Sequence, residues 1–163
     1  MNGDGPRVLA IHPNQHGFGF AVLEGPAHLV NWGVKSFPRG KGRRLTQMAW
    51  FIDHFTPDVV VFEDAGARGS HHGKRIRKDL RDLRALAKSK KVPCRAISRQ
   101  QVLQAFSVVG ARTKHQIALT IAQSIPELAS HAPRRRKLWV TEDRRMGIFD
   151  AVAFGTAFYS IEA

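Results

Sequence analysis

Three side chains that can bind cations or move protons stand where a folded chain brings distant segments together. His12 ends a short apolar run, Glu63 ends a second one, and Asp150 lies inside a third near the C-terminus. Side chains at the ends of strands converge in many α/β proteins, and a carboxylate among apolar neighbours is costly unless it is paired or bound to a cation. The sequence therefore predicts one polar centre built from three separate segments.

The elements that must position these residues begin with strands. Segments 7–12, 17–23 and 29–37 have strand patterns, and the turn residues between them favour an antiparallel meander. A helix pattern at 45–55 follows, and after it comes 58–63 (DVVVFE), an almost continuous apolar run. Such a run is typical of a central strand that is buried on both faces. Glu63 is thereby expected at the end of the most buried strand.

The second half of the sequence is mainly helical. We expect a basic helix at 74–91 and a strand at 93–97. Two further helices are expected, one at 99–106 capped by Ser98 and one at 113–124 capped by Thr113. Thr141 is expected to cap a final helix that carries Asp150. The order of elements predicts one α/β domain over 1–163, with a mixed central β-sheet of about five strands flanked by helices.

Charge and composition narrow the partners. The 163 residues include 26 Lys and Arg against 13 Asp and Glu, a net charge of +13 that favours a polyanion, above all nucleic acid. A basic surface without a partner and attachment to anionic lipid are the alternatives. No run approaches the roughly 20 apolar residues of a membrane span, and the first residues do not resemble a secretion signal. We therefore expect a cytoplasmic protein with no membrane partner.

Four motifs together resemble those of one protein family. VLAIHPNQHGFGFAVLE resembles the opening of RuvC-type Holliday junction resolvases of the RNase H-like superfamily, in which an apolar strand, an Asp-Pro-Gly turn and a Gly-rich strand follow one another. DVVVFED resembles their second motif, with its strand-terminal Glu. VVGARTKHQIALTI is similar to their Gly-Ala-x-Lys helix start, and IFDAVAFG to their closing Asp-Ala helix. The likeness covers nearly the whole chain and implies an RNase H-like fold.

The resemblance also implies an activity, namely an endonuclease that acts on branched or structured DNA. In such enzymes clustered carboxylates bind two divalent metal ions about 3.5–4 Å apart, which activate a water and stabilise the leaving oxygen. Glu63 and Asp150 are the implied ligands, and Mg²⁺ or Mn²⁺ the implied metal. By analogy, a homodimer is implied because the two strands of a junction need two cuts.

His12 departs from the family pattern, which has an aspartate at this place. A neutral imidazole offers one nitrogen and no charge, so it weakens binding of Mg²⁺ and favours Mn²⁺ or zinc-like metals. Three interpretations stay open: His12 ligates a softer metal, it orients water, phosphate or an acid, or the centre is inactive. The alternative functions are a catalytically inactive RNase H-like nucleic-acid-binding protein and a nuclease on RNA or RNA:DNA hybrids.

Asp143 is predicted as an auxiliary catalytic and metal-binding residue. The resemblance implies an acid or histidine one helical turn before Asp150, where this sequence has Gly147. At 100° per residue, Asp143 falls within about 20° of Asp150 on the same side of the expected helix. The structural alternative is an acid that stabilises the N-terminus of a helix through the helix dipole.

Basic side chains are predicted to bind the nucleic acid. Lys114 matches the motif lysine, and at a helix N-terminus its ammonium would join the backbone donors around a phosphate. Arg68, His71 and His72 lie in a Gly-rich loop, where they are expected at most to touch phosphates or bases. The contacts predicted from the basic helix are Lys74, Arg75, Arg77, Lys78 and Arg81.

Overall fold

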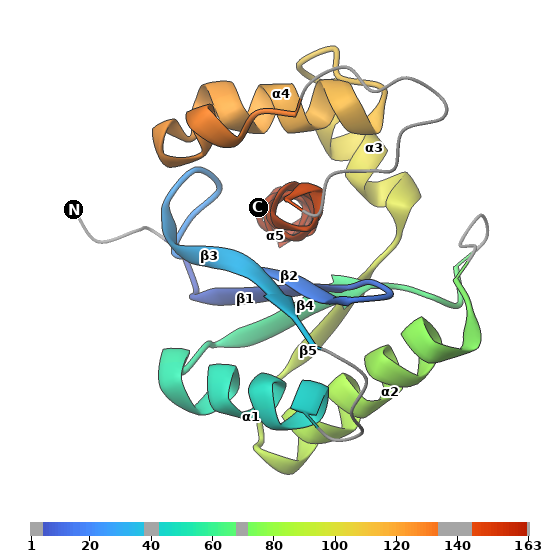
Figure 1. Ribbon diagram of the computed structural model, residues 1–163. Helices are drawn as coiled ribbons and strands as arrows, with labels where there is room; N and C mark the ends of the chain where they lie inside the picture. The colour runs from blue at the N-terminus through green and yellow to red at the C-terminus, as the bar shows by residue number, and fades with distance from the viewer. Residues whose placement is uncertain (1–4, 38–42, 68–71, 134–144, 163) are drawn as a thin grey trace.

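A five-stranded sheet lies between two groups of helices in the computed structural model, which describes residues 5–37, 43–67, 72–133 and 145–162 (Figure 1). The strands are β1 (Val8–Pro13), β2 (Gly17–Leu23), β3 (Leu29–Ser36), β4 (Val59–Glu63) and β5 (Cys94–Ile97). Their order in the sheet is β3-β2-β1-β4-β5. The predicted mixed α/β sheet and its antiparallel meander are confirmed.

The sheet topology explains why two of the predicted site residues share one edge. β1 and β2 pair antiparallel, as do β2 and β3, whereas β4 runs parallel to both β1 and β5. The pairs from Val8–Val59 to Ala10–Val61 set a register that, continued by two residues, places His12 beside Glu63. Neighbouring strands lie about 4.8 Å apart, so both side chains emerge at the same end of the sheet.

The helices form two layers around the sheet (Figure 1). One face is covered by α1 (Arg43–Phe55) and α2 (Lys74–Ser89). On the other face α5 (Met146–Glu162) packs against the sheet and is itself covered by α3 (Arg99–Ser107) and α4 (Lys114–Ser124). A 3₁₀ helix, η1 (Pro126–His131), follows α4 and was not expected from the sequence.

Helix α5 is enclosed by protein on nearly all sides. Its residues from Met146 to Gly155 are all buried, and this stretch includes Asp150. A helix that is apolar all round needs such a central position, because every side of it must leave water. The carboxylate of Asp150 is therefore carried into the interior by the apolar residues around it.

Several helix ends differ from expectation, among them the start of α1 at Arg43 instead of 45. Helix α2 ends at Ser89, before the predicted 91, because Lys91 adopts a left-handed backbone with φ +59° that stops the helix. Helix α5 begins at Met146, later than predicted from Thr141, which lies outside the described residues. None of the helices in the described segments is both long and apolar enough to cross a bilayer.

Candidate functional site

The ends of β1 and β4 and the middle of α5 bring three of the predicted site residues into one buried centre. His12, Glu63 and Asp150 are 8%, 3% and 5% exposed, respectively. The Nε2 atom of His12 lies 3.4 Å from Oδ2 of Asp150, and the charges of Asp150 and Glu63 both act on the imidazole. The convergence expected from the sequence is thus present in the fold.

His12 is held as a neutral imidazole. Burial lowers the pKa of His12 and outweighs the attraction of Asp150 and Glu63, while Lys114 and Arg99 lower it further. The ring stacks on Phe154 with centroids 6.0 Å apart, and its buried Nδ1 has no hydrogen-bond partner among the described residues. A buried neutral imidazole keeps a nitrogen lone pair available for a ligand.

Asp150 is also approached by a lysine from a helix N-terminus. Lys114 is the first residue of α4, and its Nζ lies 3.1 Å from Oδ2 of Asp150. Thr113 caps this helix as predicted: its hydroxyl oxygen accepts a hydrogen bond from the Gln116 backbone N–H, and the Gln116 side-chain oxygen accepts one from the Thr113 backbone N–H. The cap fixes where α4 starts and therefore where the lysine enters the centre.

Glu63 has two nitrogen-bearing neighbours, Arg99 and His72, that the sequence did not indicate. The Nε of Arg99, the first residue of α3, lies 3.3 Å from Oε1 of Glu63, and the imidazole of His72 contacts Oε2. Arg99 follows the end of β5 by two residues, after the Ser98 cap. This position near a strand end is the feature of the sequence from which its place at the centre could have been predicted. His72 offered no comparable signal, because its position depends on how the chain leaves β4.

Helix α5 and strand β2 approach each other at two glycines. A Cβ added to Gly147 would lie 3.2 Å from the Cα of Gly19, and a Cβ on Gly19 would clash with the Gly147 backbone. Any side chain at Gly147, the position one turn before Asp150, would therefore meet the β2 backbone. The close contact sets the depth at which α5 presents its carboxylate.

Three residues predicted to act at the site, Asp143, Arg68 and His71, lie outside the described residues. The helical register that related Asp143 to Asp150 requires a helix through both, whereas α5 begins at Met146. The role of Asp143 as an auxiliary ligand therefore stays a prediction. The basic residues predicted on α2 are exposed and lie on the opposite layer of the molecule from α5 (Figure 1).

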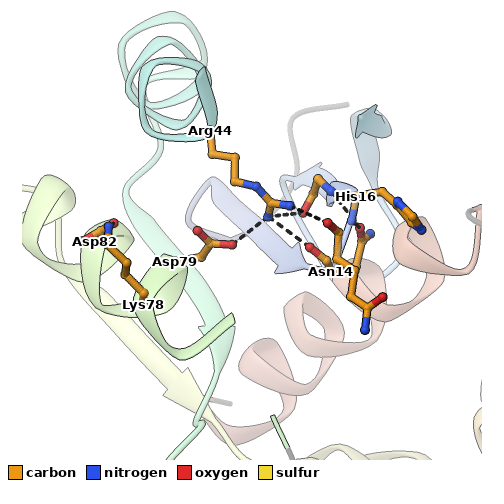
Figure 2. A network of polar contacts seen from close by, with 8 residues as sticks. Asn14, His16, Arg44, Lys78, Asp79 and Asp82 are labelled. Atoms are coloured by element: carbon orange, nitrogen blue, oxygen red, sulfur yellow. Dashed lines mark hydrogen bonds and ion pairs between the residues drawn. The ribbon is translucent and has the colours of Figure 1, made fainter. Parts of the chain in front are cut away.

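A buried arginine, missed in the sequence, anchors the turn that follows His12 (Figure 2). Arg44 extends from α1, and its Nη1 donates to Oδ2 of Asp79 on α2 at 2.7 Å. Its two terminal nitrogens also donate to backbone carbonyls of the β1–β2 turn, those of Asn14, Gln15 and Gly17. Both helices on this face are thereby tied to the turn at the edge of the centre.

Among the comparisons with known proteins, the comparison with solved structures finds matches. No protein-family model and no curated protein matches the sequence. The structure of Thermus thermophilus RuvC matches with a TM-score of 0.67 and 23% identity over 96% of each chain. This chain has the RNase H-like fold of RuvC. The resemblance seen in the four motifs is confirmed at the level of the fold.

Two further structures agree with this assignment. T. thermophilus RuvC in complex with a Holliday junction substrate matches with a TM-score of 0.66 and 20% identity over 96% of each chain. The yeast mitochondrial Holliday junction resolvase Ydc2 matches with a TM-score of 0.59 and 15% identity, over 94% of this chain and 78% of that one. The RuvC likeness therefore extends over almost the entire chain.

The donor atoms of this centre are of the types that bind divalent cations. Neighbouring ligands of an octahedral ion at 2.0–2.1 Å are about 2.9 Å apart, so His12 Nε2 and Asp150 Oδ2, which are 3.4 Å apart, would approach by about 0.5 Å to share such an ion. Within the described segments, no three His, Cys, Asp or Glu residues form a ready-made metal cluster. The donors instead come as two pairs, His12 with Asp150 and His72 with Glu63. A metal held here would need water or substrate oxygens to complete its shell.

Proposed function

We propose that this protein is a divalent-metal-dependent endonuclease of the RuvC type that cuts branched DNA such as a Holliday junction. The observation that carries the proposal is the convergence of His12, Glu63 and Asp150 at one end of the sheet. The RuvC fold and the net charge of +13 support a DNA substrate, since one structural neighbour is a complex with a Holliday junction.

Glu63 and Asp150 would hold the metal, with His12 as a nitrogen ligand. When bound, the metal supplies a Lewis acid that polarises the phosphodiester and a water of lowered pKa. Because His12 contributes no negative charge, the donor set favours Mn²⁺ over Mg²⁺. His72 contacts Glu63 and keeps that carboxylate oriented.

Arg99 and Lys114 would bind the phosphodiester. Both are first residues of helices, and both line one cavity together with Asp150. A phosphate placed at Asp150 lies within reach of the Lys114 ammonium, which is 3.1 Å from the carboxylate. Helix N-termini add backbone N–H groups that favour an anion and stabilise charge that develops on its oxygens.

The test is cleavage of a four-way junction assembled from synthetic strands, with Mg²⁺ and with Mn²⁺. The wild type should nick the junction, and Glu63→Gln and Asp150→Asn should each slow cleavage by at least about 100-fold. Asp53→Asn is the matched control, because this α1 carboxylate is 64% exposed and pairs with Lys90. Equal cleavage by all four proteins would defeat the proposal.

One observation favours a second function, a catalytically inactive nucleic-acid-binding protein. Each buried carboxylate already has a protein cation beside it, Lys114 at Asp150 and Arg99 at Glu63. Such pairs neutralise the centre without a metal. This function predicts salt-sensitive binding in EDTA and no cleavage with either metal. The same cleavage assay on RNA and on RNA:DNA hybrids tests the alternative of a nuclease that acts on these substrates. Sedimentation of the protein tests the predicted homodimer.

A further inference from the structure

Five basic residues of α2 recur at intervals of three and four, the spacing that places side chains on one side of a helix. They are Lys74, Arg77, Arg81, Arg84 and Lys88, here called the basic stripe. At 100° and 1.5 Å per residue they share a sector of about 80° and span about 21 Å. Most helices use this spacing to bury apolar side chains, whereas all five of these residues are exposed.

The charge of the basic stripe is not neutralised by nearby acids. Helix α2 contains two acids, and both are engaged elsewhere: Asp79 with the buried Arg44 at 2.7 Å, and Asp82 with Lys78 at 2.6 Å. Among the described residues, no carboxylate forms an ion pair with any member of the stripe. A row of cations without counter-charges attracts a row of anions.

The middle of the stripe borders a groove whose lining includes Glu63 of the candidate centre. Arg77, Arg81 and Arg84 line this groove together with residues of the sheet and of the turn after β4, namely Phe62, Glu63, Asp64 and Ala96. The Arg84 guanidinium lies 5.3 Å from the centre of the Phe62 ring. The groove lies on the face of the sheet that α1 and α2 cover, and it reaches the end of β4 where Glu63 is located.

We propose that the basic stripe binds the phosphodiester backbone of one strand of the DNA substrate and leads that strand to Glu63. Arginine donates two parallel hydrogen bonds to a phosphate, so arginines one helical turn apart suit successive phosphates. This inference rests on the proposed function and deepens it. It adds Arg84 and Lys88 to the contacts predicted from the sequence. It removes Arg75 and Lys78, which point about 160° and 100° away from Arg77.

Two double variants of the same helix test this assignment with equal loss of charge. Arg77→Gln/Arg81→Gln removes two members of the stripe, and Arg75→Gln/Lys78→Gln removes two cations outside it. Binding of a labelled four-way junction, a duplex and a single strand is measured by fluorescence anisotropy in EDTA over a series of KCl concentrations. Thermal unfolding of both variants confirms that each is folded.

The stripe variant should bind the junction and the duplex at least about tenfold more weakly than wild type. The slope of log affinity against log salt should fall by about 1.8 on duplex arms and about 1.4 on single strands, that is, about 0.9 or 0.7 per lost phosphate contact. The control should change the slope by less than half as much. Equal slopes for the two variants, or equal competition by polyglutamate, would overturn the proposal.

Cys94 provides a second readout beside this groove, because it lies two residues before the lining residue Ala96 on β5. It is the single cysteine of the chain, is partly exposed at the start of β5 and lies near enough to Arg84 to feel its charge. Saturating junction should slow the reaction of this thiol with a maleimide several-fold, and Arg84→Gln should remove the protection. An unchanged reaction rate in the wild-type complex would contradict a strand in the groove.

These measurements separate the stripe from the nuclease. Wild-type cleavage with identical binding by the two double variants would leave the proposed function standing and reject the stripe. If only the stripe variant binds more weakly, and the wild type cuts no junction with either metal, the stripe is supported and the nuclease is rejected.

Discussion

Two buried polar clusters of similar exposure differ in how their side chains are held. Arg44 and Asp79 are 7% and 8% exposed, and His12 and Asp150 are 8% and 5% exposed. Arg44 donates to three backbone carbonyls and to Asp79, leaving only its Nε without a partner among the described residues. His12 has one 3.4 Å contact to Asp150 and an unpartnered Nδ1.

The difference distinguishes a structural cluster from the proposed binding centre. A buried charge is tolerated when hydrogen bonds and an opposite charge replace the water it has lost. The Arg44 cluster uses nearly all its capacity to connect α1, α2 and the β1–β2 turn. At the His12 centre the carboxylates are paired with nearby side chains, but the Nδ1 of His12 has no partner among the described residues.

The largest expected effect on stability is that of Arg44→Met. The substitution leaves Asp79 buried without its partner and should lower the free energy of unfolding by about 3–5 kcal/mol. Urea denaturation measures the loss. Arg44→Met/Asp79→Leu removes both charges and should recover most of it. A loss below about 1 kcal/mol for the single variant would show that this cluster is not the scaffold.

Gly19→Ala tests whether the close packing of α5 positions the centre. The new methyl would clash with the Gly147 backbone, so we expect a loss of about 1–3 kcal/mol and weaker junction cleavage. Gly147→Ala is the control, because its Cβ would meet Gly19 at 3.2 Å and alanine favours a helix interior. Equal effects of the two substitutions in thermal unfolding and cleavage would contradict this account.

His12 should make stability depend on pH in a direction that burial determines. Burial lowers the pKa of His12 in the folded protein, whereas the unfolded imidazole titrates near the ordinary value of about 6.5. Below that pH the unfolded chain binds a proton that the folded chain does not. Stability therefore falls with decreasing pH, by up to about 1.4 kcal/mol per unit, until the folded pKa is reached.

His12→Asn removes this contribution while the other histidines remain. Urea unfolding of both proteins in EDTA between pH 5 and pH 7.5 measures the difference. The stability of wild type should decline relative to the variant as the pH falls below 6.5. Parallel curves would show that His12 is protonated equally in both states.

The smallest effect on stability is expected at an exposed ion pair of α2. Lys78 donates to Asp82 at 2.6 Å, but its side chain is 67% exposed. Lys78→Met should change the free energy of unfolding by less than about 0.5 kcal/mol, because water already solvates both charges. A loss comparable with that of Arg44→Met would remove the distinction between buried and exposed pairs on α2.

Local patterns were enough to predict most elements of the fold. The apolar run DVVVFE forms β4, a strand in the interior of the sheet. Ser98 and Thr113 each cap a helix, and each is paired by hydrogen bonds with the Gln three residues later. The strand ends and the apolar surroundings of Asp150 indicated the centre. The single domain, the cytoplasmic location and the homodimer stay predictions.

Contacts between side chains that are distant in the sequence could not be predicted from the sequence. Arg44 lies in a helix among polar residues, where a charge normally faces water, and its partner Asp79 is 35 residues away. His72 contacts Glu63 only because of the path that the chain takes between β4 and α2. The basic stripe is the opposite case, since its spacing is fully visible in the sequence.

Calorimetric titration of Mn²⁺ into the DNA-free protein tests the central claim most directly, because it reports on the converging side chains without requiring cleavage. The wild type should bind Mn²⁺, Asp150→Asn and Glu63→Gln should each weaken that binding at least about tenfold, and the exposed Asp53→Asn should leave it unchanged. Binding that is absent in the wild type, or equally strong in all four proteins, would contradict a metal centre formed by His12, Glu63 and Asp150.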